Sequence, residues 1–279
     1  MMLRQIVRQK NGLVGLVIAA VVVGAALFGP FITPYDPYAI EMSESLQPPS
    51  LAHPFGTDVF GRDVMSRLIL GARISLGVSV LSRLISIAIG TVLGLAAGYF
   101  GGRLDNGVMR SADVTLAYPG LLLLIAVMAA VGPSLASLVV ALGIVGWAAV
   151  ARIVRAQVLS VRGREFIVAV HSLGGRPARI IAKHLLPNCA SQLVIVFSMG
   201  LGMGIMAEAS MSFLGLGAQP PLPSWGSMIS SGLDYLRVAP WMSLAPGLGI
   251  TTAVLGFNLL GDACRDVMDP RSQDRGRRE

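Results

Sequence analysis

Glu208 is the residue whose type and position most clearly suggest chemistry, because it is a carboxylate within a largely apolar run. Burying a carboxylate at membrane depth is costly unless it is paired, so such a residue is a candidate for a polar pathway or a gate. Met206, Phe213 and Asn258 are further candidates for the lining of that pathway. The alternative is a residue at the membrane surface that pairs with a neighbouring cation such as Arg237.

The histidines and cysteines do not form a pattern that could hold a metal. His53, His171 and His184 lie far apart in the sequence and have no carboxylate or thiol at ligand spacing. We therefore interpret His171 and His184 as contact residues. Cys189 and Cys264 are too few for a disulfide framework.

The sequence also lacks the short motifs of the common catalytic and nucleotide sites. It contains no GxxxxGK[ST] phosphate loop, no GxSxG, no HExxH and no CxxC. An intramembrane hydrolase would need a Ser/His or paired-Asp constellation within the apolar runs, and none is visible. We expect a non-catalytic chain that carries no cofactor and no metal.

The composition is that of a polytopic membrane protein. Of 279 residues, 54% are apolar and 13% are charged, whereas soluble chains carry about a quarter charged residues. A span needs about 20 mainly apolar residues. Six runs qualify, namely residues 12–33, 75–100, 113–132, 135–153, 190–211 and 241–262. The sequence therefore predicts an all-α protein with six transmembrane helices and no separate soluble domain.

The net charge is +7, and the positions of the Lys and Arg residues indicate how the chain is oriented in the membrane. With the N-terminus inside, 17 Lys and Arg residues fall in the cytoplasm and four outside, while Arg83 lies in the second span, where we expect it to snorkel. This bias predicts that both termini are cytoplasmic and excludes nucleic acid as the reason for the charge. The first span lacks a small-residue cleavage site, so we interpret it as a retained anchor.

The segment of residues 164–188 carries charge between two apolar runs. We predict a short helix, a break at Gly174 and Gly175, a second helix opened by Pro177 and a stop at Pro187. Phe166, Ala169, Val170 and Leu173 fall at i, i+3, i+4 and i+7, which makes one apolar stripe. From periodicity alone, two interpretations are equally favoured: a docking element for a soluble partner, and an ordinary connecting loop.

Other segments have clear local interpretations. Residues 53–79 combine glycine turns with a capped helix start, and Gly90, Gly94 and Gly98 form a ladder that permits close helix packing. Residues 101–119 are spaced for an interfacial helix. Residues 211–226 are rich in Gly and Pro and suit a re-entrant segment that lines a cavity.

The charged segment resembles the EAA loop of ABC-importer permeases. Ala169, Gly174, Leu186 and Pro187 fit its spacing. Val168 stands where the family has its Glu, Val170 replaces the second Ala, and His184 replaces an apolar residue, which resembles the peptide and nickel importer branch. The resemblance implies that this loop is the coupling helix that docks into a cytoplasmic ATPase. The residues it assigns to coupling are Arg164, Phe166, Ala169, Val170, Leu173, Gly174, Arg176, His184 and Pro187.

A second resemblance covers the run HPFGTDVFGRDVMSRLILGAR that begins at His53. It is similar to the signature of the C-type permease subunit of dipeptide, oligopeptide and nickel importers. In that family this outer segment lies where the substrate-binding protein docks. Together with the outer loop after span five, it makes Asp58, Arg62, Asp63 and Trp225 the docking candidates.

The resemblance implies a type I ABC importer permease of the bacterial inner membrane. Its partners would be a sister permease, two ATPases that hold ATP and Mg, a substrate-binding protein and a peptide substrate. Residues 1–73 would form the anchor and outer segment, and residues 74–279 the core permease with its coupling loop at 152–189. The alternatives are a permease for nickel chelates or other small solutes, and a stand-alone secondary transporter.

Overall fold

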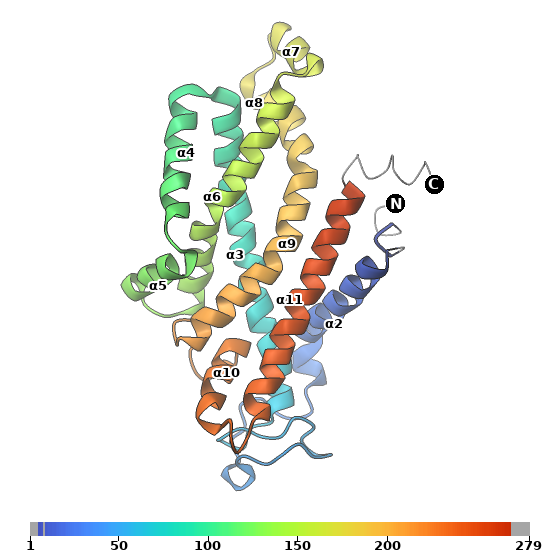
Figure 1. Ribbon diagram of the computed structural model, residues 1–279, viewed down its shortest axis with the longest axis vertical. Coiled ribbons are helices and arrows are strands. Elements are labelled where there is room, and N and C mark those ends of the chain that lie inside the picture. Colours follow the sequence, from blue (N-terminus) through green and yellow to red (C-terminus); the bar gives the residue numbers. More distant parts are fainter. Residues whose placement is uncertain (1–4, 8, 269–279) are drawn as a thin grey trace.

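The computed structural model describes residues 5–7 and 9–268, and it is helical almost throughout (Figure 1). An isolated bridge between Thr57 and Asp63 is the only β pairing within these residues. The helices are α2 (Lys10–Ile32), α3 (Val64–Phe100), α4 (Gly102–Ala117), α5 (Gly120–Val131), α6 (Leu135–Arg162), α7 (Glu165–Ser172), α8 (Pro177–Ile180), α9 (Leu186–Phe213), α10 (Trp225–Gly232) and α11 (Trp241–Met268). The all-α prediction is confirmed.

Five helices are long and apolar enough to cross a membrane, and one bent pair can supply a sixth span. The bent pair is α4 and α5, whose axes differ by 93°. The expectation of a continuous third span over residues 113–132 is therefore wrong. Tyr118 has extended backbone (φ −88°, ψ 140°), as a residue before proline prefers, and Pro119 lacks the N–H that would continue the helix.

The α3–α6 pair forms the centre of the bundle, and the glycine ladder is where the two helices touch. A Cβ at Gly90, Gly94 or Gly98 would lie 2.5–2.7 Å from the nearest atom of α6. The atoms that occupy this space belong to α6 valines and to its backbone, including Val150 and Val154. Only glycine permits this approach, so the predicted role of the ladder in packing is confirmed.

Helix α4 packs along α6 instead of lying at an interface as expected. Arg155 donates to both carboxylate oxygens of Asp105 at 2.5 and 2.6 Å, and Arg152 pairs with Asp113. These two ion pairs join the polar face of α4 to α6. Each carboxylate and guanidinium forms charge-assisted hydrogen bonds with its partner, which is more favourable than contact with an apolar surface.

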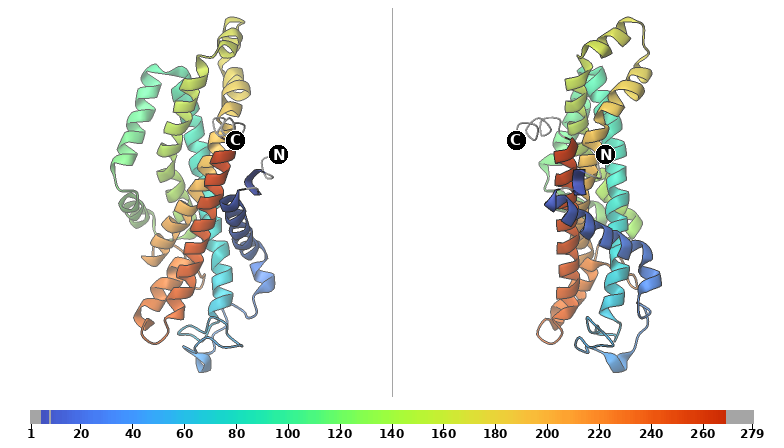
Figure 2. Two further views of the ribbon diagram at one scale, coloured as in Figure 1. Left: turned by 45° about the vertical axis from the view of Figure 1, so that its right-hand side comes forward. Right: turned by 90° about the vertical axis from the view of Figure 1, so that its right-hand side faces the viewer.

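Helices α2 and α11 complete the bundle on the other side of α3. In Figure 2, α2 lies oblique to α11. The contact is close, because a Cβ at Gly15 would lie 2.6 Å from the Leu260 nitrogen and one at Gly12 would lie 3.0 Å from the Ala263 Cβ. Residues 33–63 connect α2 to α3, and α3 is continuous across the expected boundary between residues 73 and 74.

The predicted stop at Pro187 is wrong. A π-helical segment, Ile181–Leu185, joins α8 to α9, and the three elements form one helix from Pro177 to Phe213. The Leu186 N–H bonds to the Ile181 carbonyl, five residues back. Pro187 falls in the first turn of the following α-helix, where its missing N–H costs little.

Candidate functional site

Helix α7 forms the tip of one end of the molecule (Figure 1). The exposed fraction of the residue is 43% for Phe166 and 88% for Leu173, and Ala169 is also exposed. Val170 is partly buried. An exposed apolar stripe on a projecting element is typical of a protein interaction site. We call Phe166, Ala169, Val170 and Leu173 the α7 stripe.

Two features hold α7 in place. Gly174 has φ +79°, a left-handed conformation that ends the helix and that other residues adopt at a cost. Ile167, 3% exposed, packs into the core formed by α3, α6 and the start of α9. The predicted break at Gly174 and the helix start at Pro177 are confirmed. The sequence pattern did not single out Ile167, although it is an apolar residue that lies off the stripe and could therefore have been expected to face the core.

The other residues assigned to coupling lie around α7 in different ways. The rings of Phe166 and His184 lie 6.4 Å apart, so the structure brings these two together. The backbone carbonyls of Arg164 and Arg176 accept the first hydrogen bonds of α7 and α8. Their side chains are exposed. Pro187 lies in the first turn of α9.

The 33–63 segment lies at the opposite end and is held by buried charge. His53 Nδ1 is 2.9 Å from Asp63 Oδ1, and His53 Nε2 is 3.2 Å from Glu44 Oε2. Asp63 also caps α3 by accepting the Ser66 N–H at 2.7 Å. Asp58 accepts from the Arg62 side chain at 2.7 Å.

These bonds bear on the docking candidates. The side chains of Asp58, Asp63 and Arg62 are 8%, 1% and 14% exposed. They therefore shape the segment and offer little surface to a second protein, so direct contact through their charges is not supported by this geometry. Docking on this end of the molecule stays a prediction.

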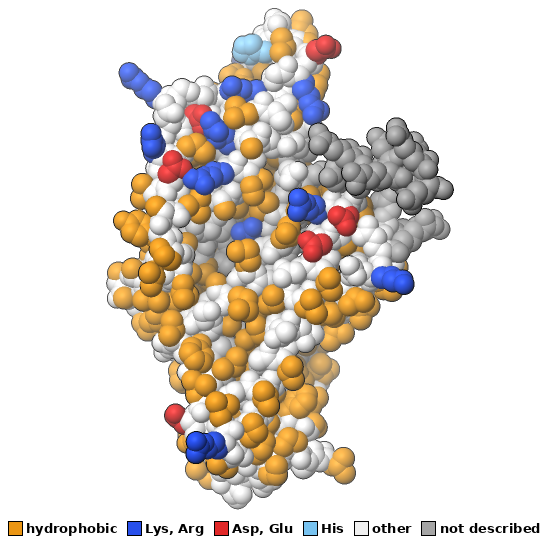
Figure 3. Space-filling model, viewed as in Figure 1, with side chains coloured by type: hydrophobic (Ala, Val, Ile, Leu, Met, Phe, Trp, Pro, Cys, Tyr) orange, Lys and Arg blue, Asp and Glu red, His pale blue; other side chains and the backbone are white. Residues whose placement is uncertain are grey.

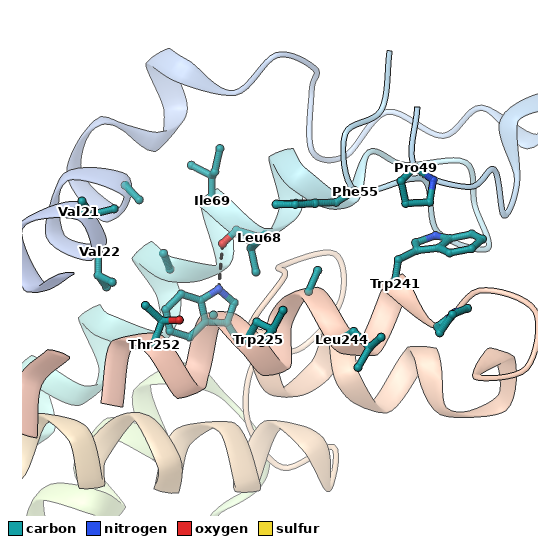
Figure 4. Close-up of a pocket in the computed structure, with 16 residues that line it drawn as sticks. Val21, Val22, Pro49, Phe55, Leu68, Ile69, Trp225, Trp241, Leu244 and Thr252 are labelled. Atoms are coloured by element: carbon teal, nitrogen blue, oxygen red, sulfur yellow. Dashed lines mark hydrogen bonds between the residues drawn. The ribbon is translucent and has the colours of Figure 1, made fainter. Parts of the chain in front are cut away.

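Trp225, the fourth docking candidate, is buried within the bundle, so its docking role stays a prediction. It is 3% exposed, and its indole Nε1 donates to the Leu68 carbonyl at 2.9 Å (Figure 4). The indole lines an apolar cavity of 580 Å³ between α2, α3 and α11, together with Phe55 and Trp241. Residues after α9 thus fold back as α10 and pack between spans, because an aromatic side chain of this size is most stable when it is buried with its N–H bonded.

Glu208 lies fully buried where α9 meets the loop before α10. The Ser212 hydroxyl donates to Glu208 Oε1 at 2.6 Å, and the Ala218 N–H donates to the Ser212 hydroxyl at 3.1 Å. Oε2 has no hydrogen-bond partner among the residues that the structure describes. The suggested pairing with Arg237 is wrong, since Glu208 is 0% exposed and bonds to Ser212.

The other pathway candidates are surface residues. Met206 and Phe213 are 49% and 36% exposed, and Asn258 is exposed on α11. Asn258 Oδ1 would lie 2.8 Å from a Cβ at Gly202, so this amide rests against the glycine-rich part of α9. Glu208 points into the protein while these three face outward, and the structure does not bring the four together.

Charge is distributed unevenly along the molecule. In Figure 3, Lys and Arg side chains gather toward the end that carries α7 and α8, and a broad apolar belt covers the middle. The start of α2 and the end of α11 both point toward the α7 end (Figure 1). This is the pattern of a protein whose middle lies in a lipid bilayer.

Comparison with known families gives two matches. The family described as "Binding-protein-dependent transport system inner membrane component" matches residues 90–274. The family described as "N-terminal TM domain of oligopeptide transport permease C" matches residues 1–49.

Curated relatives match over nearly their full length. A dipeptide transport system permease protein of Alkalihalophilus pseudofirmus is 41% identical over 268 residues, 96% of this chain and 88% of the relative. A glutathione transport system permease protein of Pectobacterium atrosepticum is 43% identical, with the same two coverages. An oligopeptide transport system permease protein of Bacillus subtilis is 38% identical over 94% of this chain and 86% of the relative.

Among solved structures, the inward-facing MetNI methionine ABC transporter has a chain with a similar fold. The TM-score is 0.57 at 21% identity, over 73% of this chain and 97% of that one. The fold is therefore that of an ABC importer permease.

Proposed function

The chain belongs to the family of binding-protein-dependent transport system inner membrane components, the permeases of ABC importers, and from this premise we propose that it is the transmembrane subunit of a peptide importer. The names of its relatives support peptides, from dipeptides to oligopeptides and glutathione, as the substrate class. We make the peptide importer the single proposal, because nothing in the geometry favours a nickel chelate or a stand-alone secondary transporter.

The proposal includes the partners that such a permease requires. A sister permease would complete the translocation path, two cytoplasmic ATPases would bind ATP and Mg, and a substrate-binding protein would deliver the peptide from outside. Both termini and α7 would face the cytoplasm of the bacterial cell. The observation that carries this proposal is the exposed α7 stripe at the cationic end of a membrane-embedded bundle.

The fold suggests how the ATPase would drive transport. Helix α7 connects through α8 and the π segment to α9, and Pro177–Phe213 is one helix of 37 residues, about 55 Å long at 1.5 Å rise per residue. A shift of α7 in its ATPase groove would therefore be carried as a rigid-body movement to the opposite side of the membrane. ATP would favour one conformation because it binds that conformation better.

Co-purification tests the proposal. We would tag this chain in its own cells, extract the membranes in mild detergent and identify the proteins that come with it. We expect a second permease and phosphate-loop ATPases. Leu173→Asp or Phe166→Asp should lose the ATPases and keep the sister permease, because a carboxylate in the α7 stripe would be desolvated on docking.

Leu51→Asp is the matched control, since Leu51 is fully exposed at the opposite end of the molecule. It should retain both the ATPases and the sister permease. Recovery of the wild-type chain alone, as a monomer or homo-oligomer, would contradict the importer proposal. Retention of the ATPases in both α7 variants would contradict only the docking role of the stripe.

A further inference from the structure

Arg83 lies at the middle of α3 and reaches across to α9. Its Nε and Nη2 donate to the Val196 carbonyl at 3.2 and 2.7 Å, and the guanidinium lies against Gly200. Among residues 5–7 and 9–268, no carboxylate pairs with Arg83 and its Nη1 has no hydrogen-bond partner. The expected snorkelling is therefore wrong. The cation is held within the bundle with donor capacity to spare.

The guanidinium faces an open cavity of 470 Å³ between α3, α6, α9 and α11. Its lining contains three methionines, two arginines and one glutamine, and no Asp or Glu. The lining residues are Arg83, Ile153, Gln192, Ile195, Val196, Met199, Gly200, Met203, Arg265 and Met268. The arginines and the glutamine make part of the lining cationic and polar. The rest of the lining is apolar, and its methionine side chains are flexible.

The position of this cavity and its charged lining argue that lipid does not cover it. Arg83 lies 19 residues after the start of α3 and 17 before its end, close to the middle of a helix about 55 Å long. The lining also includes Arg265 and Met268 from the end of α11 that points toward α7, so the cavity lies toward the α7 side of the bundle. A cation there faces water or protein, since exposure to hydrocarbon is costly. Met203, which is 76% exposed, lines the cavity from α9.

The chemistry of the lining selects one kind of ligand. A guanidinium with a free nitrogen binds a carboxylate through charge-assisted hydrogen bonds. Methionines adapt to side chains of varied shape. A peptide combines these requirements, because every peptide with a free C-terminus has the same carboxylate while its side chains differ.

We propose that this cavity is a transit site for the peptide and that Arg83 binds the peptide's C-terminal carboxylate. The inference rests on the proposed function and adds to it the residue that contacts substrate within the helix bundle. Arg83 would give up one of its two hydrogen bonds to the Val196 carbonyl and bind the carboxylate instead. The methionines would contact the side chains of the peptide.

Cysteine labelling tests the site directly. We would introduce Met203→Cys into the complete importer in phosphatidylcholine nanodiscs and measure its reaction with a maleimide. The native Cys189 and Cys264 are 1% and 7% exposed, so they leave the background low. The probes are the dipeptide Ala-Phe and its C-terminal amide. At about ten times its dissociation constant, the acid should slow labelling about tenfold and the amide far less.

Two variants separate the ligand role from a packing role. Arg83→Gln should remove the protection by the acid, and Arg83→Lys should retain part of it. Arg73→Gln is the matched control, because Arg73 is an exposed arginine of the same helix and has no partner among the described residues. It should behave as wild type. Loss of the single charge-assisted contact should weaken acid binding about tenfold or more.

Equal protection by acid and amide in the wild-type background would overturn the inference, and so would full protection in Arg83→Gln. The acid-to-amide comparison needs no substitution at Arg83, so it decides even if Arg83→Gln fails to assemble. Uptake of the same dipeptide into proteoliposomes is measured in parallel. An importer that carries the peptide without acid-specific protection overturns this inference alone, whereas one that carries no peptide overturns the proposed function.

Discussion

Glu208 shows how a single buried carboxyl can connect several parts of a helix bundle. Its Oε1 ends the hydrogen-bond chain that runs from the Ala218 N–H through the Ser212 hydroxyl. The hydroxyls of Ser75 and Ser224 lie nearby. These groups come from α3, α9 and the loop that precedes α10, so one side chain fixes three parts of the fold at once.

We therefore expect Glu208→Gln to keep most of the stability and Glu208→Leu to lose about 1–3 kcal/mol. The amide oxygen of Gln accepts the same bond from Ser212, while Leu leaves that hydroxyl buried without its acceptor. Thermal unfolding of the complex in nanodiscs measures the difference.

Peptide uptake by Glu208→Gln decides between the packing role and the pathway role first suggested by the sequence. Uptake close to wild type is expected from a residue that is 0% exposed. A stable variant that no longer transports would show instead that the charge of Glu208 takes part in passage or gating.

At the scale of single elements, the turn after α7 has the strictest backbone requirement at the coupling end. Gly174 has φ +79°, and nothing lies within 4 Å of where its Cβ would be. Space is therefore not limiting there, and only the backbone conformation requires glycine. Gly163, before α7, has equal space but φ −87°, which any residue adopts.

This pair gives a controlled experiment on the orientation of α7. Gly174→Ala and Gly163→Ala add the same methyl group at the two ends of one short helix. Gly174→Ala should strain the turn by about 1 kcal/mol and lower peptide uptake per ATP hydrolysed, because a tilted α7 transmits less of the ATPase movement. Gly174→Asp should uncouple further by adding a charge at the same turn.

Gly163→Ala should couple as wild type does. Uptake and ATP hydrolysis measured on the same proteoliposomes give the ratio directly. Unchanged coupling in Gly174→Ala would show that the strained turn does not set the orientation of α7 against the ATPase.

The elements that sequence reasoning predicted well are those encoded by local pattern. Apolar length identified most of the spans, and the left-handed glycine followed by Pro177 fixed the break after α7. The errors arose where a local signal was overridden. Pro187 suggested a stop, but the π segment Ile181–Leu185 shifts the register so that proline falls in a first turn.

The functional roles were harder to predict than the helices, because burial depends on partners distant in sequence. Asp63 has the features of a surface docking residue, yet His53 and the Ser66 N–H satisfy it internally. Trp225 bonds to Leu68, which is 157 residues away. The bridge from Arg83 to the Val196 carbonyl spans 113 residues and has no sequence signal that periodicity could detect.

At the scale of the whole molecule, charge and hydropathy together define an axis. The α7 end carries most of the Lys and Arg visible in Figure 3, the middle is apolar, and the 33–63 segment lies at the other end. A bilayer about 30 Å thick covers only part of a bundle whose longest helices reach about 55 Å. In the proposed orientation the α7 end would project from the membrane on the side that cationic residues prefer, which is the cytoplasm.

This orientation leads to a labelling prediction in intact cells. Leu51 and Leu104 are 104% and 46% exposed, at the 33–63 segment and at the start of α4. A membrane-impermeant maleimide added to spheroplasts should modify Leu51→Cys at once and Leu104→Cys only after the bilayer is permeabilised. The wild-type chain is the control, since its two cysteines are buried. The reverse pattern would place α7 outside, where no ATPase could reach it, and labelling of both positions from outside would mean that the bundle does not span the membrane along this axis.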